Sequence, residues 1–351
     1  MNNFSNEDFC KSLPKIELHA HLNGSLSETT LIQLGSTNSD IAEYQKLKHV
    51  PPHERTLNDC FKIFQFAHKV TTSPNSVYAA TKNVIDEFFL DNVIYLELRT
   101  TPRSEDGMDA ETYIESVVEA IKDNEKDILV KLILSINRQH SLEVCRQHLD
   151  IILKMKKKYP DIIKGIDLSG NPHHGRFSNL QKLFQEARDH GLFTTIHCAE
   201  IVNNDEVKDI LHFEPDRIGH APFVHPRYGG CAENWTTLQK NKVPTEFCLT
   251  SNIISGTTNL YENHHIREWI NNKLPFSINT DDKGIFHTNL SQEFEYALKY
   301  LALSPLELWQ ISLDSVDHTF ATSEEKSLLR FKLEQWKKGT FEQRYKENLD
   351  L

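Results

Sequence analysis

The sequence lacks the features that would send a chain into a membrane or onto a nucleic acid. No apolar run approaches the roughly 20 residues of a membrane-spanning helix. The first residues, MNNFSNEDFCKS, have neither a cationic flank nor an apolar core, so we expect no export signal. Thirty-nine Lys and Arg residues face 50 Asp and Glu, a net charge of −11. We therefore expect no membrane and no nucleic-acid partner, although a local basic pocket is compatible with this charge.

Paired cysteine motifs and flexible linkers are also missing. The six cysteines are scattered, as expected for reduced thiols in a cytoplasmic protein: Cys10, Cys60, Cys145, Cys198, Cys231 and Cys248. There is no internal repeat, no low-complexity segment and no linker rich in Gly, Pro or Ser. We expect one domain over residues 1–351, with a monomer as the default state.

What the sequence does contain is an alternation of short apolar runs with amphipathic segments. Helical segments include 110–122, 141–159 and 179–191. The predicted strands cover residues 16–21, 93–99, 129–137, 162–170, 193–200, 216–220, 243–252 and 275–282. Eight apolar strands separated by helices favour a closed (β/α)₈ TIM barrel over an open sheet.

Two regions exceed the minimal barrel. Residues 56–70 and 76–92 predict extra helices between strands one and two. The tail after residue 323 is a charged helical pattern that we expect to pack on the barrel.

Polar residues gather where the predicted strands end. Five of the eight strands finish in such groups: His19 with His21, residues 167–170, His197 with Glu200, His220, and Asp281 with Asp282. Each group alone has a structural role that would account for it, such as a hydrogen-bonded core histidine or an Asp-Gly turn. Active sites of this barrel lie at the carboxyl ends of the strands, so the convergence favours a metal site.

The ligand types indicate which metal ion the site would bind. His19 and His21 are two residues apart on a strand, which places both rings on one face. Histidines together with an aspartate form a mixed N/O set that suits zinc. Residues 167–170, DLSG, offer no lysine to bridge two ions, so a metal-dependent hydrolase barrel with one metal is predicted.

Several stretches together resemble one family. LPKIELHAHLNGS, DLSGNP, IHCAE, RIGHA and NTDDKGIF follow in order over residues 11–325. They are similar to the adenosine/AMP deaminase family, and the HAHLNGS, LELRTTPR and CLTSN versions most resemble its branch that deaminates N6-methyl-AMP. The resemblance implies a barrel with one Zn²⁺ per chain that converts N6-methyl-AMP and water to IMP and methylamine.

The resemblance also implies roles for individual residues. Zinc would be held by His19, His21, His197 and Asp281. A zinc-activated water would attack carbon 6 of the purine, Glu200 would protonate the ring, and His220 would orient and deprotonate the water. Asp282 and the backbone of Gly170 would hold the purine edge.

Asn23 is the residue that favours a nucleotide substrate. Nucleoside deaminases of the family carry Asp at this position, facing the ribose 5′-hydroxyl. A carboxylate about 4 Å from a phosphate would oppose it by roughly 4 kcal/mol per unit charge, whereas an amide does not. The alternative is that Asn23 only begins an Asn-Gly turn. The 5′-phosphate would be bound by residues of two segments: Thr101, Pro102, Arg103, Ser104 and, from an inserted helix, His68.

Two positions depart from the family pattern. Asn137, at the end of strand three, stands where relatives have Asp, so the ribose or phosphate contact expected there departs from the family pattern. Ala221 replaces a glycine after His220, and we expect its methyl group to disfavour a left-handed backbone there.

Three alternatives remain open at this point. An adenosine or AMP deaminase would use the same chemistry on another substrate. A metal-dependent phosphoester hydrolase fits the ligand types but lacks ligands for a second metal. A catalytically dead zinc- or nucleotide-binding protein would need neither Glu200 nor His220.

Overall fold

Eight parallel strands, paired in chain order, form the centre of the computed structural model, which describes residues 5–51, 54–55, 57–105 and 107–341. The strands are β1 (Lys15–His21), β2 (Val93–Thr100), β3 (Leu129–Asn137), β4 (Ile163–Ser169), β5 (Phe193–Cys198), β6 (Arg217–His220), β7 (Thr245–Phe247) and β8 (Phe276–Ile278). Just beyond β8, Asp281 bridges to Ala20 of β1 in parallel and brings the sheet round to its start. The predicted (β/α)₈ barrel is thereby confirmed.

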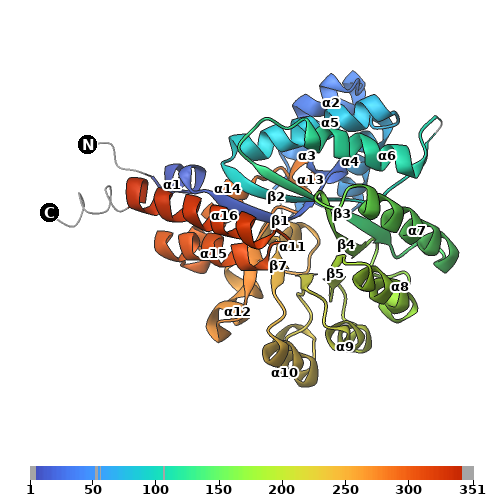
Figure 1. Cartoon of the computed structure of the whole chain (residues 1–351). Coiled ribbons are helices and arrows are strands. Elements are labelled where there is room, and N and C mark those ends of the chain that lie inside the picture. Colours follow the sequence, from blue (N-terminus) through green and yellow to red (C-terminus); the bar gives the residue numbers. More distant parts are fainter. Residues whose placement is uncertain (1–4, 52–53, 56, 106, 342–351) are drawn as a thin grey trace.

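Helices surround these strands (Figure 1). Before β2 lie α1 (Asn6–Ser12), α2 (Glu28–Gln33), α3 (Asn38–Lys48), α4 (Leu57–Val70) and α5 (Pro74–Leu90). Between later strands lie α6 (Ala110–Lys122), α7 (Leu142–Lys158), α8 (Phe177–Asp189), α9 (Asn204–Phe213), α10 (Ala232–Asn241), α11 (Leu249–Ile254) and α12 (Ile266–Asn272). After β8 come α13 (Lys283–Phe286), α14 (Leu290–Leu301), α15 (Pro305–His318) and α16 (Ser323–Trp336). The extra helices predicted between strands one and two are α4 and α5; Thr56 of the first prediction lies outside the described residues.

Helix α7 illustrates why these segments are helical. The Ser141 side chain caps its first turn by accepting a hydrogen bond from the Val144 amide. Its last turn carries the lysines of 156–158, whose charge favours the carboxyl end of a helix. One face, with Leu149 and Ile152, is buried against the barrel. Capping, charge and periodicity thus agree along the segment.

Two strand predictions extend too far. The run 243–252 predicts one strand, but β7 ends at Phe247 and α11 begins at Leu249. The first turn of α11 is held from outside the segment, since Glu293 of α14 accepts hydrogen bonds from the Thr250 amide and hydroxyl. The run 275–282 likewise forms only the short β8, after which the chain turns at Asp281 with φ +61°.

The charged tail packs where it was predicted to. Leu329 and Leu333 of α16 join Ile16 and Leu18 of β1 in one buried cluster. A short π-helical turn, Lys337–Phe341, follows, and residues 342–351 of the predicted tail lie outside the described residues. Within the part of the chain that the structure describes, no helix is both long and apolar enough to cross a bilayer.

Candidate active site

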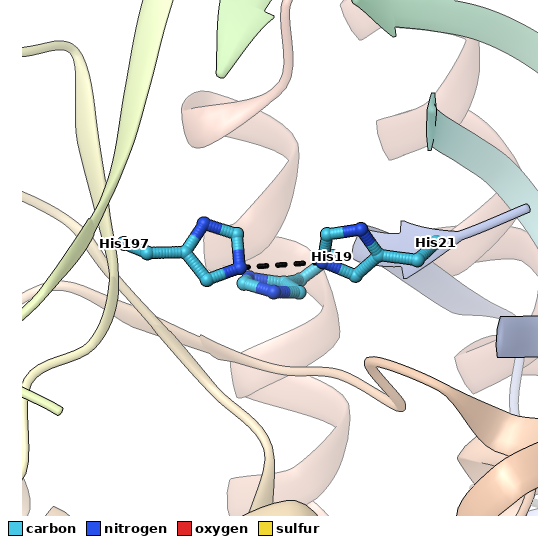
Figure 2. A group of neighbouring side chains, drawn as sticks. All are labelled: His19, His21 and His197. Carbon is cyan, nitrogen blue, oxygen red and sulfur yellow. Dashed lines mark hydrogen bonds between the residues drawn. The ribbon is translucent and has the colours of Figure 1, made fainter. Parts of the chain in front are cut away.

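Three of the predicted ligands meet at the carboxyl ends of two strands. His19 and His21 extend from β1 and His197 from β5, so that His21 and His197 face each other across His19 (Figure 2). The Nε2 atoms of His21 and His197 are 3.2 Å apart. One ring nitrogen from each of the three lies within 4.8 Å of the others. Three imidazoles at this spacing could bind a single metal ion.

Asp281 supplies a carboxylate to the same group. Its Oδ1 lies 3.5 Å from His19 Nε2 and 3.4 Å from His21 Nε2, and its Oδ2 accepts a hydrogen bond of 2.8 Å from Ser251. Burial raises the pKa of Asp281, but bonding and charge from His19 outweigh burial and hold it well below its usual range. The carboxylate is therefore ionised beside the imidazoles.

These four residues fit a divalent cation. His19 Nε2 is buried and has no hydrogen-bond partner among the described residues, although Asp281 is close. Burial lowers the pKa of His21 to about 3, so its imidazole is neutral and can bind a metal. Burial also lowers the pKa of His197, but its neighbour Asp167 outweighs this and raises it to about 9, so a metal would compete with a proton there. A cation at this point could bind both His19 Nε2 and the Asp281 carboxylate.

Two buried carboxylates orient the histidines from behind. His19 Nδ1 lies 2.6 Å from Glu246 Oε2, and His197 Nδ1 lies 3.0 Å from Asp167 Oδ1. Arg99 spans both acids, with Nη1 3.3 Å from Asp167 and Nη2 2.9 Å from Glu246. Such partners fix the tautomer and the ring orientation of metal-binding histidines. The sequence reasoning noted Asp167 only as part of DLSG and missed the other two.

The network continues into the barrel. Arg217 donates from Nε to Glu246 Oε1 at 2.6 Å and also pairs with Glu97. Glu97 in turn accepts hydrogen bonds from the Tyr95 hydroxyl and the Phe320 amide, both at 2.6 Å. Arg217, Glu97 and Glu246 are all at most 1% exposed. The spacing of two in LELR, which places Glu97 and Arg99 on one face of β2, is the signal that could have identified part of this network.

Glu200 lies just beyond β5, two residues after the strand ends. The intervening Ala199 has φ +57°, which turns the chain at that point. Burial, and after it the charge of Asp281, raise the pKa of Glu200, although His197 opposes the shift. A raised pKa favours the protonated carboxyl, the form that can donate a proton.

His220 is held in a strained backbone at the end of β6. Its Nε2 lies 3.8 Å from Asp281 Oδ2, and burial lowers its pKa well below the usual value. His220 and Ala221 both have left-handed φ angles, +61° and +56°. The expectation that alanine would avoid this conformation is wrong. The Ala221 amide donates a hydrogen bond of 3.0 Å to the Cys198 carbonyl, which holds the chain in the left-handed conformation. His265 Nε2 also donates to the His220 carbonyl at 2.8 Å.

The residues predicted for the purine edge, Asp282 and Gly170, follow β8 and β4, which are not neighbours in the sheet. Asp282 is buried, and burial followed by the charge of Asp281 raises its pKa well above the usual range. Gly24 is required beside it, since a Cβ there would lie 1.6 Å from Asp282 Oδ1. Gly170 lies against the Asn137 side chain. Asn137 Oδ1 already accepts a hydrogen bond from the Gln139 amide, which engages this oxygen locally.

The loop after β2 holds the residues predicted to bind phosphate. Pro102 is buried, Thr101 is half-buried and Ser104 is exposed. Arg103 is turned toward the protein: its Nη2 donates to the Thr71 carbonyl and hydroxyl, and its Nη1 lies 3.6 Å from Glu105. The cation is thus near the predicted subsite but partly engaged.

Asn23 is half-buried in the turn after β1, Asn23–Ser25. Its Nδ2 donates to the Tyr113 hydroxyl at 3.3 Å, a contact that sequence reasoning did not foresee. His68, on α4, is close to Arg103: partial burial, and after it the charge of Arg103, lower the pKa of His68. The predicted phosphate contacts therefore come from the turn after β1, the loop after β2 and an inserted helix.

Comparisons with known proteins agree with this geometry. The family model "Adenosine deaminase" matches residues 14–336. The "Adenosine deaminase-like protein" of Drosophila melanogaster is 39% identical over 91% of this chain and 95% of its own length. The human "N6-Methyl-AMP deaminase" is 37% identical over 93% and 94%. A solved structure of "arabidopsis ADAL complexed with IMP" superposes with a TM-score of 0.83 at 36% identity, covering 94% of this chain and 98% of that one.

Proposed function

The chain belongs to the adenosine deaminase family, and we propose that it is a zinc-dependent hydrolase that converts N6-methyl-AMP and water to IMP and methylamine. The observation that carries the proposal is the convergence of His19, His21, His197 and Asp281 on one point, with Glu200 and His220 beside them. The names of the relatives and the IMP bound in the Arabidopsis structure support a purine nucleotide as substrate.

The four convergent residues would hold the zinc ion. Bound there, zinc would act as a Lewis acid and lower the pKa of a bound water to about 7. Glu246 and Asp167 keep the Nδ1 protons on His19 and His197. The lone pair of Nε2 in each ring is then available to the metal.

Glu200 and His220 would move the protons. Glu200, with its raised pKa, donates a proton to ring nitrogen 1 of the purine, which prevents negative charge from building up in the ring. His220 is neutral because burial lowers its pKa, so it can accept a proton from the attacking water. Proton transfers of this kind contribute typically about 10²–10⁴-fold each.

The base would be held by Asp282 and Gly170. A carboxyl whose pKa is well above the usual range stays protonated, so Asp282 can donate a hydrogen bond to an acceptor nitrogen of the purine. The backbone of Gly170 contacts the edge from β4. Asn137 would reach the ribose or phosphate through its Nδ2, because its Oδ1 is engaged.

The 5′-phosphate would lie against Asn23 and the loop after β2. An amide at position 23 gives hydrogen bonds without the repulsion of a carboxylate. Thr101, Ser104 and His68 provide further donors, Pro102 shapes the loop, and Arg103 supplies positive charge.

Parallel assays test the substrate. Purine absorbance is followed with N6-methyl-AMP, AMP, N6-methyladenosine and adenosine, and the metal in purified protein is quantified. We expect one zinc per chain and the highest kcat/KM with N6-methyl-AMP. His19→Ala and Asp281→Ala should lose metal and activity together. Preference for AMP or adenosine would reassign the substrate, release of inorganic phosphate would indicate a phosphoester hydrolase, and two metal ions per chain would contradict the mechanism.

A further inference from the structure

Tyr113, on α6, connects the residues proposed to recognise the phosphate. It is fully buried, and its hydroxyl lies 2.7 Å from Thr100 Oγ1 at the end of β2. The same hydroxyl accepts the hydrogen bond from Asn23 Nδ2. The Arg103 guanidinium lies 5.8 Å from the centre of the Tyr113 ring. One buried side chain therefore lies against three residues of two segments around the proposed phosphate: Asn23, Thr100 and Arg103.

The Asn23 amide is satisfied at only one end. Its Nδ2 points to Tyr113, whereas its Oδ1 is buried without a hydrogen-bond partner among the described residues. A phosphate dianion offers only acceptor oxygens, so it cannot bind to Oδ1. It needs the N–H₂ end of the amide.

A half-turn of the amide resolves this mismatch. The two ends of an amide have nearly the same shape, so the turn needs no additional space. A tyrosine hydroxyl can donate as well as accept, and Thr100 can donate to the tyrosine oxygen in return. The hydrogen bonds then run from Thr100 to Tyr113 to Asn23 Oδ1, and the Asn23 N–H₂ group faces the subsite.

We propose, on the basis of the function proposed above, that Tyr113 is a positioning residue: its hydroxyl anchors the Asn23 oxygen and so directs the amide N–H₂ group at the 5′-phosphate of the substrate. Tyr113 is fully buried and its hydroxyl is engaged by Thr100 and Asn23, so it acts on the substrate through Asn23. Burial also raises its pKa, which keeps the hydroxyl protonated and able to donate. Its effect should therefore appear only with substrates that carry a phosphate.

The test is Tyr113→Phe, which removes the hydroxyl and keeps the ring. The kcat/KM is measured with N6-methyl-AMP and with N6-methyladenosine. We expect the ratio of nucleotide to nucleoside to fall by about threefold to tenfold, the effect of one neutral hydrogen bond. A general loss of packing would lower both values equally and leave the ratio unchanged.

Two further variants test whether the effect of Tyr113 passes through Asn23. Tyr78→Phe removes another tyrosine hydroxyl, which donates to Asp123 at the carboxyl end of α6, and should leave the ratio at the wild-type value. In an Asn23→Ala background, Tyr113→Phe should not change the ratio further, since the residue it positions is gone. An unchanged ratio in Tyr113→Phe, or a ratio that still falls in the Asn23→Ala background, would overturn the proposal.

Binding measurements separate this inference from the catalytic one. Calorimetric titration with IMP and with inosine needs no turnover, so it is informative even if none of the methylated or amino substrates reacts. Tyr113→Phe should weaken the binding of IMP by about threefold to tenfold and leave the binding of inosine unchanged. Equal weakening of both ligands would reject the role of Tyr113, whereas absent deamination with selective weakening of IMP would reject only the proposed reaction.

Discussion

The metal-binding side of the site and the phosphate side are built differently. His19 and His197 are each fixed by a buried carboxylate, and Arg99 fixes both carboxylates in turn. On the other side, the Asn23 oxygen has no partner among the described residues, and Ser104 is exposed. One side is determined by several layers of contacts, and the other leaves polar groups unpaired or open to solvent.

The difference follows from what each side must do. Chemistry at carbon 6 needs its groups within fractions of an ångström, and rigid supporting contacts provide that precision. Recognition of a phosphate depends mainly on charge and on hydrogen bonds that side chains can form on binding. Loss of one residue should therefore be severe on the metal-binding side and selective for the substrate on the phosphate side.

The largest expected effect is that of Glu200→Gln on turnover. The amide keeps the size of the side chain but cannot deliver a proton to the ring, so kcat should fall by about 10²–10⁴-fold. Zinc content should stay at the wild-type value, because Glu200 is not among the proposed ligands. A near-wild-type rate would move the proton donor elsewhere, with Asp282 as the next candidate.

The next largest effect is expected on zinc affinity, from the loss of Glu246, the buried carboxylate beside His19. Glu246→Gln removes the charge that His19, Arg99 and Arg217 share, and zinc affinity should drop by about 10–100-fold in competition with a chelator. Glu186→Gln, which breaks the half-exposed pair with Arg146, is the matched control and should leave the affinity unchanged. Equal affinities in both variants would mean that the buried carboxylate does not support the metal site.

Much of the metal-binding side could be predicted from the sequence, but the buried residues behind the ligands could not. Eight apolar runs and the polar residues after them are local signals, so the predicted strands match β1 to β6 to within two residues at each end, and the histidines lie at strand ends as predicted. The contact of Arg99 with Glu246 joins positions 147 residues apart and depends on the closure of the barrel. The wrong extension of β7 has the same origin, because the contacts that hold α11 come from Glu293 on α14.

A smaller, substrate-selective effect is expected from Asn23→Asp. The new carboxylate repels a phosphate dianion but not a 5′-hydroxyl, and water, Arg103 and a raised carboxyl pKa all soften the repulsion. We expect about a tenfold loss of kcat/KM for N6-methyl-AMP, equivalent to about 1.4 kcal/mol, with little change for N6-methyladenosine. Arg103→Ala should act in the same direction. An equal loss with both substrates would show that position 23 does not face the phosphate.

The smallest effect tests the strain stored beside His220. Ala221 and Ala302 have nearly the same left-handed φ, +56° and +58°, but Ala221 is buried and Ala302 is exposed at the end of α14. Ala302→Gly relieves strain and loses no packing, so the free energy of unfolding should rise by about 1 kcal/mol. Ala221→Gly relieves the same strain but removes a buried methyl group worth about 0.8 kcal/mol, so it should gain less.

Denaturant titration of the two variants measures this difference directly. If Ala221→Gly gained as much as Ala302→Gly, the methyl group would contribute nothing to packing, and the alanine would only add strain next to the proposed base. A smaller gain would show instead that the contacts around Ala221 support the strained turn. That turn would then belong, like the histidines and their carboxylates, to the part of the site where surrounding contacts determine the geometry.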